Sequence, residues 1–140
     1  MAVREVLVFP DKRLRRVAEP VATIDTAIQA LIADLIDTMY AAAGIGLAAI
    51  QIGEPWRVVV IDLTNKDEPR QPRVFINPEV TWHSEEAAIH TEGCLSIPAS
   101  YEEVKRPAFV RVRHLDRNGA QREIEASGLV AACLQHEIEH

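Results

Sequence analysis

The clearest pattern of apolar and polar positions lies between residues 23 and 44. Apolar side chains recur there at helical spacing, which predicts an amphipathic helix. They are Ile28, Leu31, Ile32, Leu35, Ile36 and Met39. Asp25 or Thr26 is suited to cap the start of this helix, and Gly44 is suited to end it.

Several segments predict β-strands. Residues 3–9 form a short strand candidate, and the prolines of residues 10–21 keep the next segment extended or turning. Residues 56–63 are rich in β-branched side chains, which is typical of a buried strand. Residues 73–82 begin a further β stretch, and we expect Pro78 to interrupt it.

The hairpin signal lies further along, at residues 109–126. Two alternating segments are joined there by Asn118 and Gly119, a pair that favours a tight turn. The segment that follows, residues 127–140, is expected to be helical, with Ser127 as its N-cap. Its apolar face consists of Leu129, Val130, Cys133, Leu134 and Ile138.

This order of elements favours the α+β class. We expect antiparallel β-sheets packed around a C-terminal metal-binding helix, with a second helix near the N-terminus. A length of 140 residues predicts a single domain over residues 1–140. An apolar content of 48% is enough for a substantial core.

Composition narrows the classes of partner. The formal charge of −6 argues against DNA, other nucleic acids or an anionic membrane as partners. The longest apolar runs are too short to span a bilayer, and the first residues do not have the pattern of a secretory signal. We therefore expect the cytoplasm or an equivalent reducing compartment, with Cys94 and Cys133 as free thiols.

The chemistry is most concentrated at residues 135–140, "QHEIEH". His136 and His140 stand four positions apart with Glu137 between them, the HExxH pattern of hydrolytic metal sites. Four residues are close to one helical turn, so both imidazoles leave the same face. The alternative is a pair of surface histidines beside a glutamate. We prefer a metal site because the residues before the motif are almost all apolar.

Such a site needs at least one further protein ligand. Besides many carboxylates, the candidates upstream are Cys94, Cys133, His83, His90 and His114. Cys133 shares a helix with His136, which would give poor tetrahedral geometry, so a packed apolar thiol is the better interpretation. Cys94 lies between a glycine and a proline in "TEGCLSIP", and taken alone it fits a core cysteine and a ligand equally well.

The segment "GIGLAAIQ" at residues 44–51 allows two interpretations. It can be a helix end followed by a tightly packed strand. It can also be a place where two glycines let a substrate backbone approach. Gln51 would then offer its amide to a developing oxyanion.

Taken in order, three motifs make the chain resemble the peptide deformylase family. They are "GIGLAAIQ" at residues 44–51, "EGCLS" at residues 92–96 and "QHEIEH" at residues 135–140. The similarity also runs through "VLVFPDKRLRRVAEPV", "VFINPEV" and "RPAFVRVRHLDRNG", and so covers essentially the whole chain.

The resemblance implies removal of the formyl group from the N-terminal formylmethionine of nascent polypeptides. It implies that Cys94, His136 and His140 hold one divalent metal ion. Fe²⁺ would be the native ion, and Zn²⁺, Ni²⁺ or Co²⁺ would also fit. Glu137 would transfer the proton of the attacking water, as a general acid–base. The amide of Gln51 and the backbone N–H of Leu95 would stabilise the oxyanion.

The resemblance also implies substrate contacts and a partner. An apolar pocket would receive the methionine side chain, and Gly46 would offer its backbone to the peptide. The remaining residues implied in substrate binding are Ile45, Glu92, Leu129, Ala132 and Cys133. Family members usually continue past the second histidine with an extension that aids docking at the ribosome. The sequence stops at His140, so we expect proximity to the ribosome without that docking segment, and a weakly held His140.

One further departure is Glu139, where the family usually has aspartate; Arg106 is its expected partner. Two rival functions fit part of the pattern. An HExxH endopeptidase would usually take its third ligand from downstream of the motif. A remnant that binds formylated N-termini without turnover would follow if the helix lost its metal.

Overall fold

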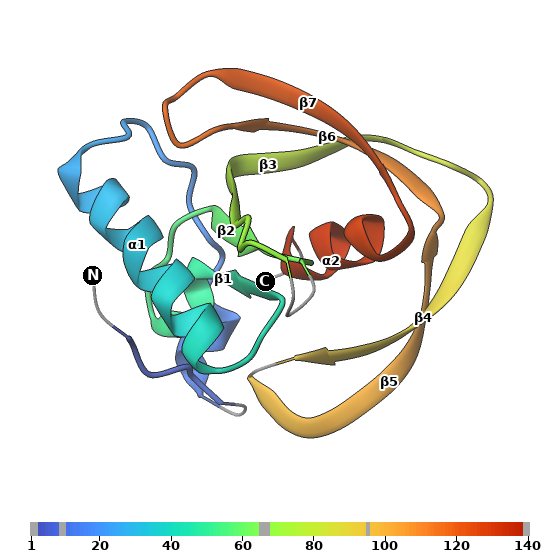
Figure 1. The fold of residues 1–140 in the computed structure, drawn as a ribbon, viewed down its shortest axis with the longest axis horizontal. Coiled ribbons are helices and arrows are strands. Elements are labelled where there is room, and N and C mark those ends of the chain that lie inside the picture. Colours follow the sequence, from blue (N-terminus) through green and yellow to red (C-terminus); the bar gives the residue numbers. More distant parts are fainter. Residues whose placement is uncertain (1–2, 9–10, 65–67, 95, 139–140) are drawn as a thin grey trace.

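The computed structural model describes residues 3–8, 11–64, 68–94 and 96–138. Two helices and antiparallel strands make up these residues, which confirms the predicted α+β class (Figure 1). In chain order the elements are η1 (Lys12–Arg15), α1 (Thr26–Ala41), β1 (Gly46–Ala48), η2 (Ala49–Ile52), β2 (Val58–Ile61), β3 (Arg73–His83), β4 (Ala87–Cys94), β5 (Ile97–Pro107), β6 (Phe109–Leu115), β7 (Gln121–Ser127) and α2 (Gly128–Ile138). The two η elements are short 3₁₀ helices.

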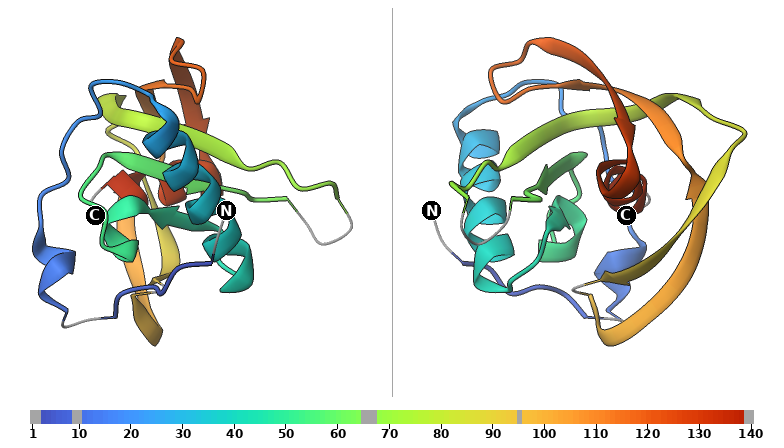
Figure 2. Two further views of the ribbon diagram at one scale, coloured as in Figure 1. Left: turned by 90° about the vertical axis from the view of Figure 1, so that its left-hand side faces the viewer. Right: turned by 45° about the vertical axis from the view of Figure 1, so that its right-hand side comes forward.

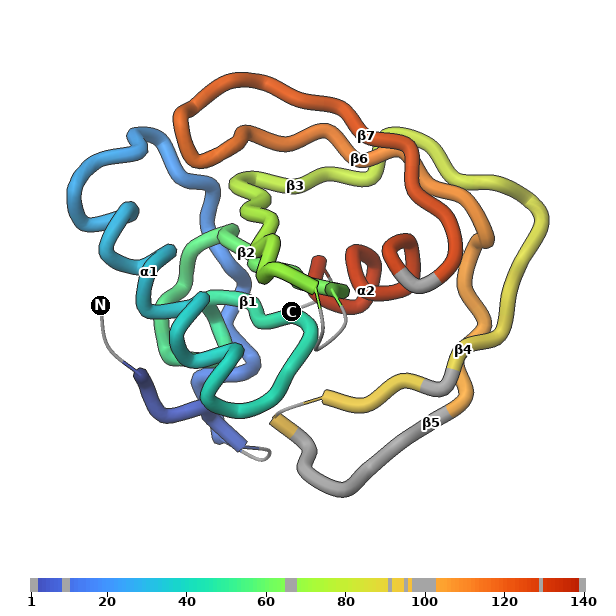
Figure 3. Tube along the Cα trace, in the orientation of Figure 1, coloured from blue at the N-terminus to red at the C-terminus, as the bar shows by residue number. Residues whose placement is uncertain are grey.

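The strands form two antiparallel sheets. One sheet has the order β1-β2-β3-β6-β7, and the other consists of β4 and β5. The chain leaves the larger sheet after β3, runs out along β4, and returns along β5 to enter β6 beside β3 (Figure 3). This excursion curves around α2, which therefore lies between the larger sheet and the β4–β5 hairpin (Figures 1 and 2).

Strand β2 is buried on both faces, which explains its unbroken apolar sequence. Val58 and Val60 point into a core cluster that includes the buried face of α1. Val59 and Ile61 point into a second cluster that includes Ala131 and Leu134 of α2. The sheet thus separates two cores, one under each helix.

Helix α1 begins as predicted, because the side chain of Asp25 accepts a hydrogen bond from the backbone N–H of Ile28. At its other end Ala43, with φ of 54°, adopts the left-handed conformation. The N–H of Gly44 then bonds to the carbonyl of Met39, 2.9 Å away, which closes the last turn.

The hairpin predicted over residues 109–126 is confirmed as β6 and β7. Its turn places Gly119 at φ of 84°, and the N–H of Gly119 bonds to the carbonyl of Asp116. The strand predicted over residues 3–9 is wrong for residues 3–8, which form no strand. Individual hydrogen bonds hold this segment instead. For example, the N–H of Leu7 donates to the carbonyl of Gln51.

Pro78 does not interrupt its strand as we expected. Strand β3 runs through it, with an irregular register between Ile76 and Glu79. Pro78 cannot donate to a ladder, and the irregularity accommodates it. Asn77 takes φ of 52° beside it, and its side chain exchanges two hydrogen bonds with the backbone of Val21.

Ala43 allows a direct test of this account of the α1 terminus. Ala43→Gly should raise the free energy of unfolding by roughly 1 kcal/mol, because glycine adopts positive φ without the steric penalty of a Cβ. The neighbouring Ala42 has φ of −88°, so Ala42→Gly should instead be destabilising. Urea denaturation of both variants measures the difference, and a matching loss of stability would rule out the explanation.

Candidate metal centre

Helix α2 places His136 and Glu137, the first residues of the HExxH motif, next to buried side chains. Ala131 and Leu134 on one face are almost fully buried in the second core cluster. His136 and Glu137 follow on the next turn, where Glu137 is only 7% exposed. The helix was predicted to extend to residue 140, but residues 139 and 140, and therefore His140, lie outside the described residues.

His136 is oriented by a carboxylate from another element. Its Nδ1 lies 2.9 Å from Oε1 of Glu92, on strand β4. An ionised carboxylate can only accept, so Nδ1 carries the proton and donates it. The other ring nitrogen, Nε2, is thereby the one that can serve as a metal ligand once its proton is lost.

Cys94 reaches the same place from the end of β4. The register of the β4–β5 hairpin shifts between Gly93, opposite Tyr101, and Cys94, opposite Ile97. Such an irregularity re-aims the side chain that follows it. Cys94 lies close enough to His136 to be the largest influence on its pKa, so the structure brings together the thiol and the imidazole predicted as ligands.

Gln51 approaches this pair from η2, and its side chain is buried. Its Oε1 accepts from the backbone N–H of Ala48 at 2.9 Å, and this bond distinguishes the oxygen from the nitrogen of the side-chain amide. The Nε2 group therefore points to the site, where it donates to Oγ of Ser96 at 3.1 Å and lies 3.5 Å from Sγ of Cys94. Ser96 is a contact that the sequence motifs did not single out, although it belongs to "EGCLS".

Gly46 makes room for Glu137. A Cβ added at Gly46 would lie 3.2 Å from Cγ and 3.3 Å from Oε1 of Glu137. The sequence suggested that this glycine admits a substrate backbone, and the structure adds a second reason for it. The carboxylate of Glu137 lies 4.0 Å from Nε2 of His136, so it stands beside the predicted ligand.

The electrostatics of the site favour a cation. Cys94 foremost, with Glu137 and Glu92, raises the pKa of His136 to about 9 against the opposing effect of burial. Burial tends to raise the pKa of Glu92, but hydrogen bonds from Arg106 and His136 outweigh this and hold it below its ordinary value. Carboxylates thus surround an imidazole and a thiol, a donor set that suits a divalent metal.

Cys133 is in a different setting. Burial, with the charges of Glu137 and Glu92, raises its pKa to about 12, so the thiol stays neutral. It packs against the second core cluster, as expected of an apolar thiol. No three metal-binding side chains converge within the described residues, where Cys94 and His136 are the predicted ligands that can be placed.

Comparisons with known proteins decide the family. The sequence profile described as "Polypeptide deformylase" matches residues 3–140. The chain belongs to the peptide deformylase family. A peptide deformylase of Afipia carboxidovorans is 56% identical over 140 residues, which are all of this chain and 82% of that protein. One of Phenylobacterium zucineum is 53% identical, with 83% of its length covered.

Solved structures agree with the family assignment. A peptide deformylase from Legionella pneumophila superposes with a TM-score of 0.92 at 47% identity, covering 99% of this chain and 80% of that one. A complex of the Ehrlichia chaffeensis peptide deformylase with actinonin gives a TM-score of 0.94 at 39% identity, covering 100% of this chain and 84% of that one.

Peptide deformylases are metal-dependent hydrolases that remove the N-formyl group from nascent polypeptides, and this is the activity of the chain. The predicted family and enzyme class are therefore confirmed. The comparisons favour neither the HExxH endopeptidase nor the inactive remnant. None of the helices in the described part of the chain has both the length and the apolar character that crossing a bilayer requires.

The other residues implied by the peptide deformylase motifs are placed only in part. Ile45 is 47% exposed, Ala132 is buried and Cys133 is half-buried. Leu95 lies outside the described residues, as does the side chain of Leu129. Glu92 was predicted to bind substrate, but both of its oxygens are engaged by Arg106 and His136.

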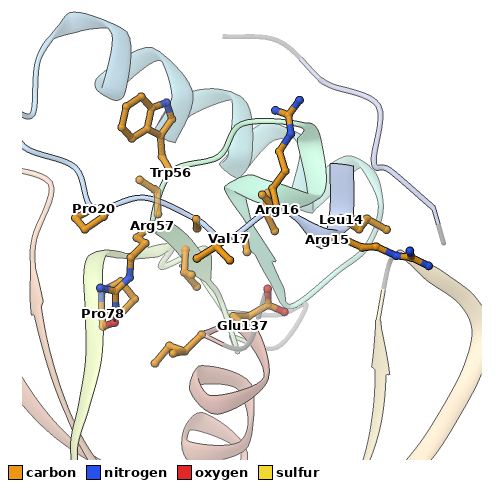
Figure 4. Close-up of a pocket in the computed structure, with 15 residues that line it drawn as sticks. Leu14, Arg15, Arg16, Val17, Pro20, Trp56, Arg57, Pro78 and Glu137 are labelled. Carbon is orange, nitrogen blue, oxygen red and sulfur yellow. Dashed lines mark hydrogen bonds between the residues drawn. The ribbon is translucent and has the colours of Figure 1, made fainter. Parts of the chain in front are cut away.

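Glu137 also lines a cavity of about 560 Å³ (Figure 4). Its lining includes the apolar side chains of Ile50 and Val59, and Figure 4 shows Val17 between Arg57 and Glu137. Among its described lining residues are none of those implied for the methionine pocket of a peptide deformylase. Of the site residues that the structure describes, Glu137 alone lines this cavity.

The contact between Gly46 and Glu137 predicts a specific defect. Gly46→Ala should lower the rate of formate release from a formyl-methionyl peptide roughly ten-fold, since the new Cβ displaces the Glu137 carboxylate by a few tenths of an ångström. Gly119→Ala is the control. It strains a remote turn at φ of 84° and should reduce thermal stability while sparing the rate. Full turnover by Gly46→Ala would contradict the proposed fit.

Proposed function

We propose that residues 1–140 form one catalytic domain in which Cys94, His136 and His140 hold a single divalent metal ion. The contact between Cys94 and His136, brought together from β4 and α2, is the observation that carries this proposal. The one-turn spacing from His136 supports His140 as the third ligand. Thiolate and imidazole donors suit Fe²⁺, the expected native ion, and also accommodate Zn²⁺, Ni²⁺ or Co²⁺.

When bound, the ion supplies Lewis acidity and activates water for attack on the formyl carbon. Glu137 accepts the proton that this water loses and returns it to the departing amine nitrogen as the carbon–nitrogen bond breaks. Formate and the free methionine amine are the products. The burial of Glu137 and its place beside His136 support this role.

Gln51 is suited to stabilise the negative oxygen that forms during attack. The bond from Ala48 holds its amide so that Nε2 faces Cys94 and Ser96. A donor fixed in advance costs little reorganisation when charge develops. The backbone N–H of Leu95 is proposed as the second donor, by position in the motif.

The substrate would lie along β1, which is an edge strand of the larger sheet. Its free edge can accept an extended peptide beside Gly46. Ile45, Leu129, Ala132 and Cys133 are proposed to surround the methionine side chain. Glu92 is not retained in this set, because its carboxylate is committed to Arg106 and His136.

The proposed partner is the formylated N-terminus of a nascent chain, encountered near the ribosome. A reducing compartment such as the cytoplasm suits this chemistry, since an oxidised Cys94 could not serve as a ligand.

The two cysteines provide a matched test of the ligand set. Cys94→Ala should abolish stoichiometric binding of Ni²⁺ or Zn²⁺, because one of the three proposed protein ligands is lost. Cys133→Ala should still bind one ion per chain. Elemental analysis of both purified variants measures the stoichiometry, and one ion per chain in Cys94→Ala would exclude this cysteine as a ligand.

Glu137→Gln separates proton transfer from metal binding. The amide is nearly isosteric but cannot accept the proton, so the variant should keep its metal and lose roughly two or more orders of magnitude in the rate of formate release. Glu125→Gln, an exposed change on β7, should retain the parental rate. Near-normal turnover in Glu137→Gln would remove Glu137 from the mechanism.

A further inference from the structure

Arg106, on strand β5, forms a buried ion pair with Glu92. Its Nε donates to Oε2 of Glu92 at 2.6 Å, and its Nη2 donates to Oε1 at 2.7 Å. The two side chains are 8% and 10% exposed. The Arg113–Glu79 pair on the larger sheet is a useful contrast, since its side chains are 48% and 58% exposed. The Arg106 pair is therefore shielded from water, whereas the Arg113 pair is not.

Burial makes the partner of Glu92 essential. Taking a carboxylate out of water costs free energy unless an opposite charge and hydrogen bonds compensate it. Arg106 provides both, in the two-pronged geometry that guanidinium and carboxylate groups favour. If Arg106 were absent, Glu92 would lose the two hydrogen bonds that fix its carboxylate, and that carboxylate would no longer be held where it accepts from Nδ1 of His136.

The pair of Arg106 and Glu92 also determines how His136 is oriented. Oε1 of Glu92 accepts from Arg106 and from Nδ1 of His136 at once. This fixes the ring plane of His136 and its tautomer, so that Nε2 is directed to the side where Cys94 and Glu137 lie. Residues that act on a metal ligand in this way commonly change metal affinity when they are replaced.

We propose that Arg106 is a positioning residue of the metal centre, which acts through Glu92 to hold His136 in the orientation and tautomer that bind the ion. The inference rests on the proposed role of His136 as a ligand. It also revises two expectations from the sequence. Glu92 serves the metal ligand in place of the substrate, and Arg106 is engaged by Glu92, whereas its expected partner Glu139 lies outside the described residues.

Metal release tests this proposal without depending on turnover. Wild type, Arg106→Met, Arg106→Lys, Glu92→Gln and the control Arg113→Met are loaded with Co²⁺, and the ion is then withdrawn by excess chelator. Arg106→Met should release it roughly 10- to 100-fold faster than wild type. Arg106→Lys keeps the charge but not the paired geometry and should fall between. Arg113→Met should match wild type.

Two further measurements separate positioning from a general loss of structure. The visible absorption spectrum of bound Co²⁺ should change in Arg106→Met and Glu92→Gln, because the geometry of His136 changes, and should stay as in wild type in Arg113→Met. The double variant Glu92→Gln/Arg106→Met should release the ion no faster than the faster single variant, since both changes act through one imidazole. Multiplied effects would overturn the proposal.

The outcomes distinguish this inference from the proposed function. If wild type binds no ion stoichiometrically, the ligand assignment itself fails. If wild type binds its ion and Arg106→Met releases it at the wild-type rate with an unchanged spectrum, Arg106 has no positioning role and the ligand assignment stands. Should Arg106→Met fail to fold by circular dichroism, Glu92→Gln decides: wild-type release and spectrum in that variant would overturn the inference.

Discussion

The structure depends on burying a helix that carries polar side chains. Helix α2 is enclosed by the larger sheet on one side and by the β4–β5 hairpin on the other (Figure 2). Its apolar residues pack against the larger sheet. Near its end, however, the polar residues Gln135, His136 and Glu137 occupy consecutive positions. Every polar group taken out of water needs a partner. Much of the local architecture follows from supplying these partners.

The strands around α2 supply a hydrogen-bond partner or space for each of these three side chains. The amide of Gln135 donates to the carbonyl of Pro107, at the end of β5, and to that of Ala131 within the helix. His136 is met by Glu92 from β4. Gly46 leaves the space on β1 that Glu137 occupies. The residues that make α2 chemically useful therefore also fasten it to the strands around it.

Sequence patterns predicted the elements whose residues follow a local rule. The apolar spacing of α1, its Asp25 cap and the Asn118-Gly119 hairpin were all correct. The β4–β5 hairpin was not predicted. Its strands mix alanine, glutamate and isolated apolar residues, because much of it faces solvent, as Ile89 does at 68% exposure. The alternation of apolar and polar residues that predicts a strand is weak where the strand is only partly buried.

In the site, too, sequence patterns predicted some of the residues and missed others. The motifs identified Cys94, Gln51, His136 and Glu137, and the structure gathers these four. The role of Arg106 could not be found in this way. In the hairpin register Arg106 lies opposite Ala88, whereas Glu92 lies opposite Glu102. No cross-strand pairing rule joins Arg106 to Glu92, so their contact becomes visible only in the folded hairpin.

This arrangement explains why a ligand upstream of the helix is physically suitable. A thiol on β4 and an imidazole on α2 belong to elements joined by no sheet ladder, so a shared ion would tie the hairpin to the helix. Glu92 already ties the same two elements without any ion, and Arg106 extends that tie to β5. The protein-only contacts thus arrange Cys94 and His136 before metal arrives. Binding to such a prepared site loses less conformational entropy than binding to a loose one.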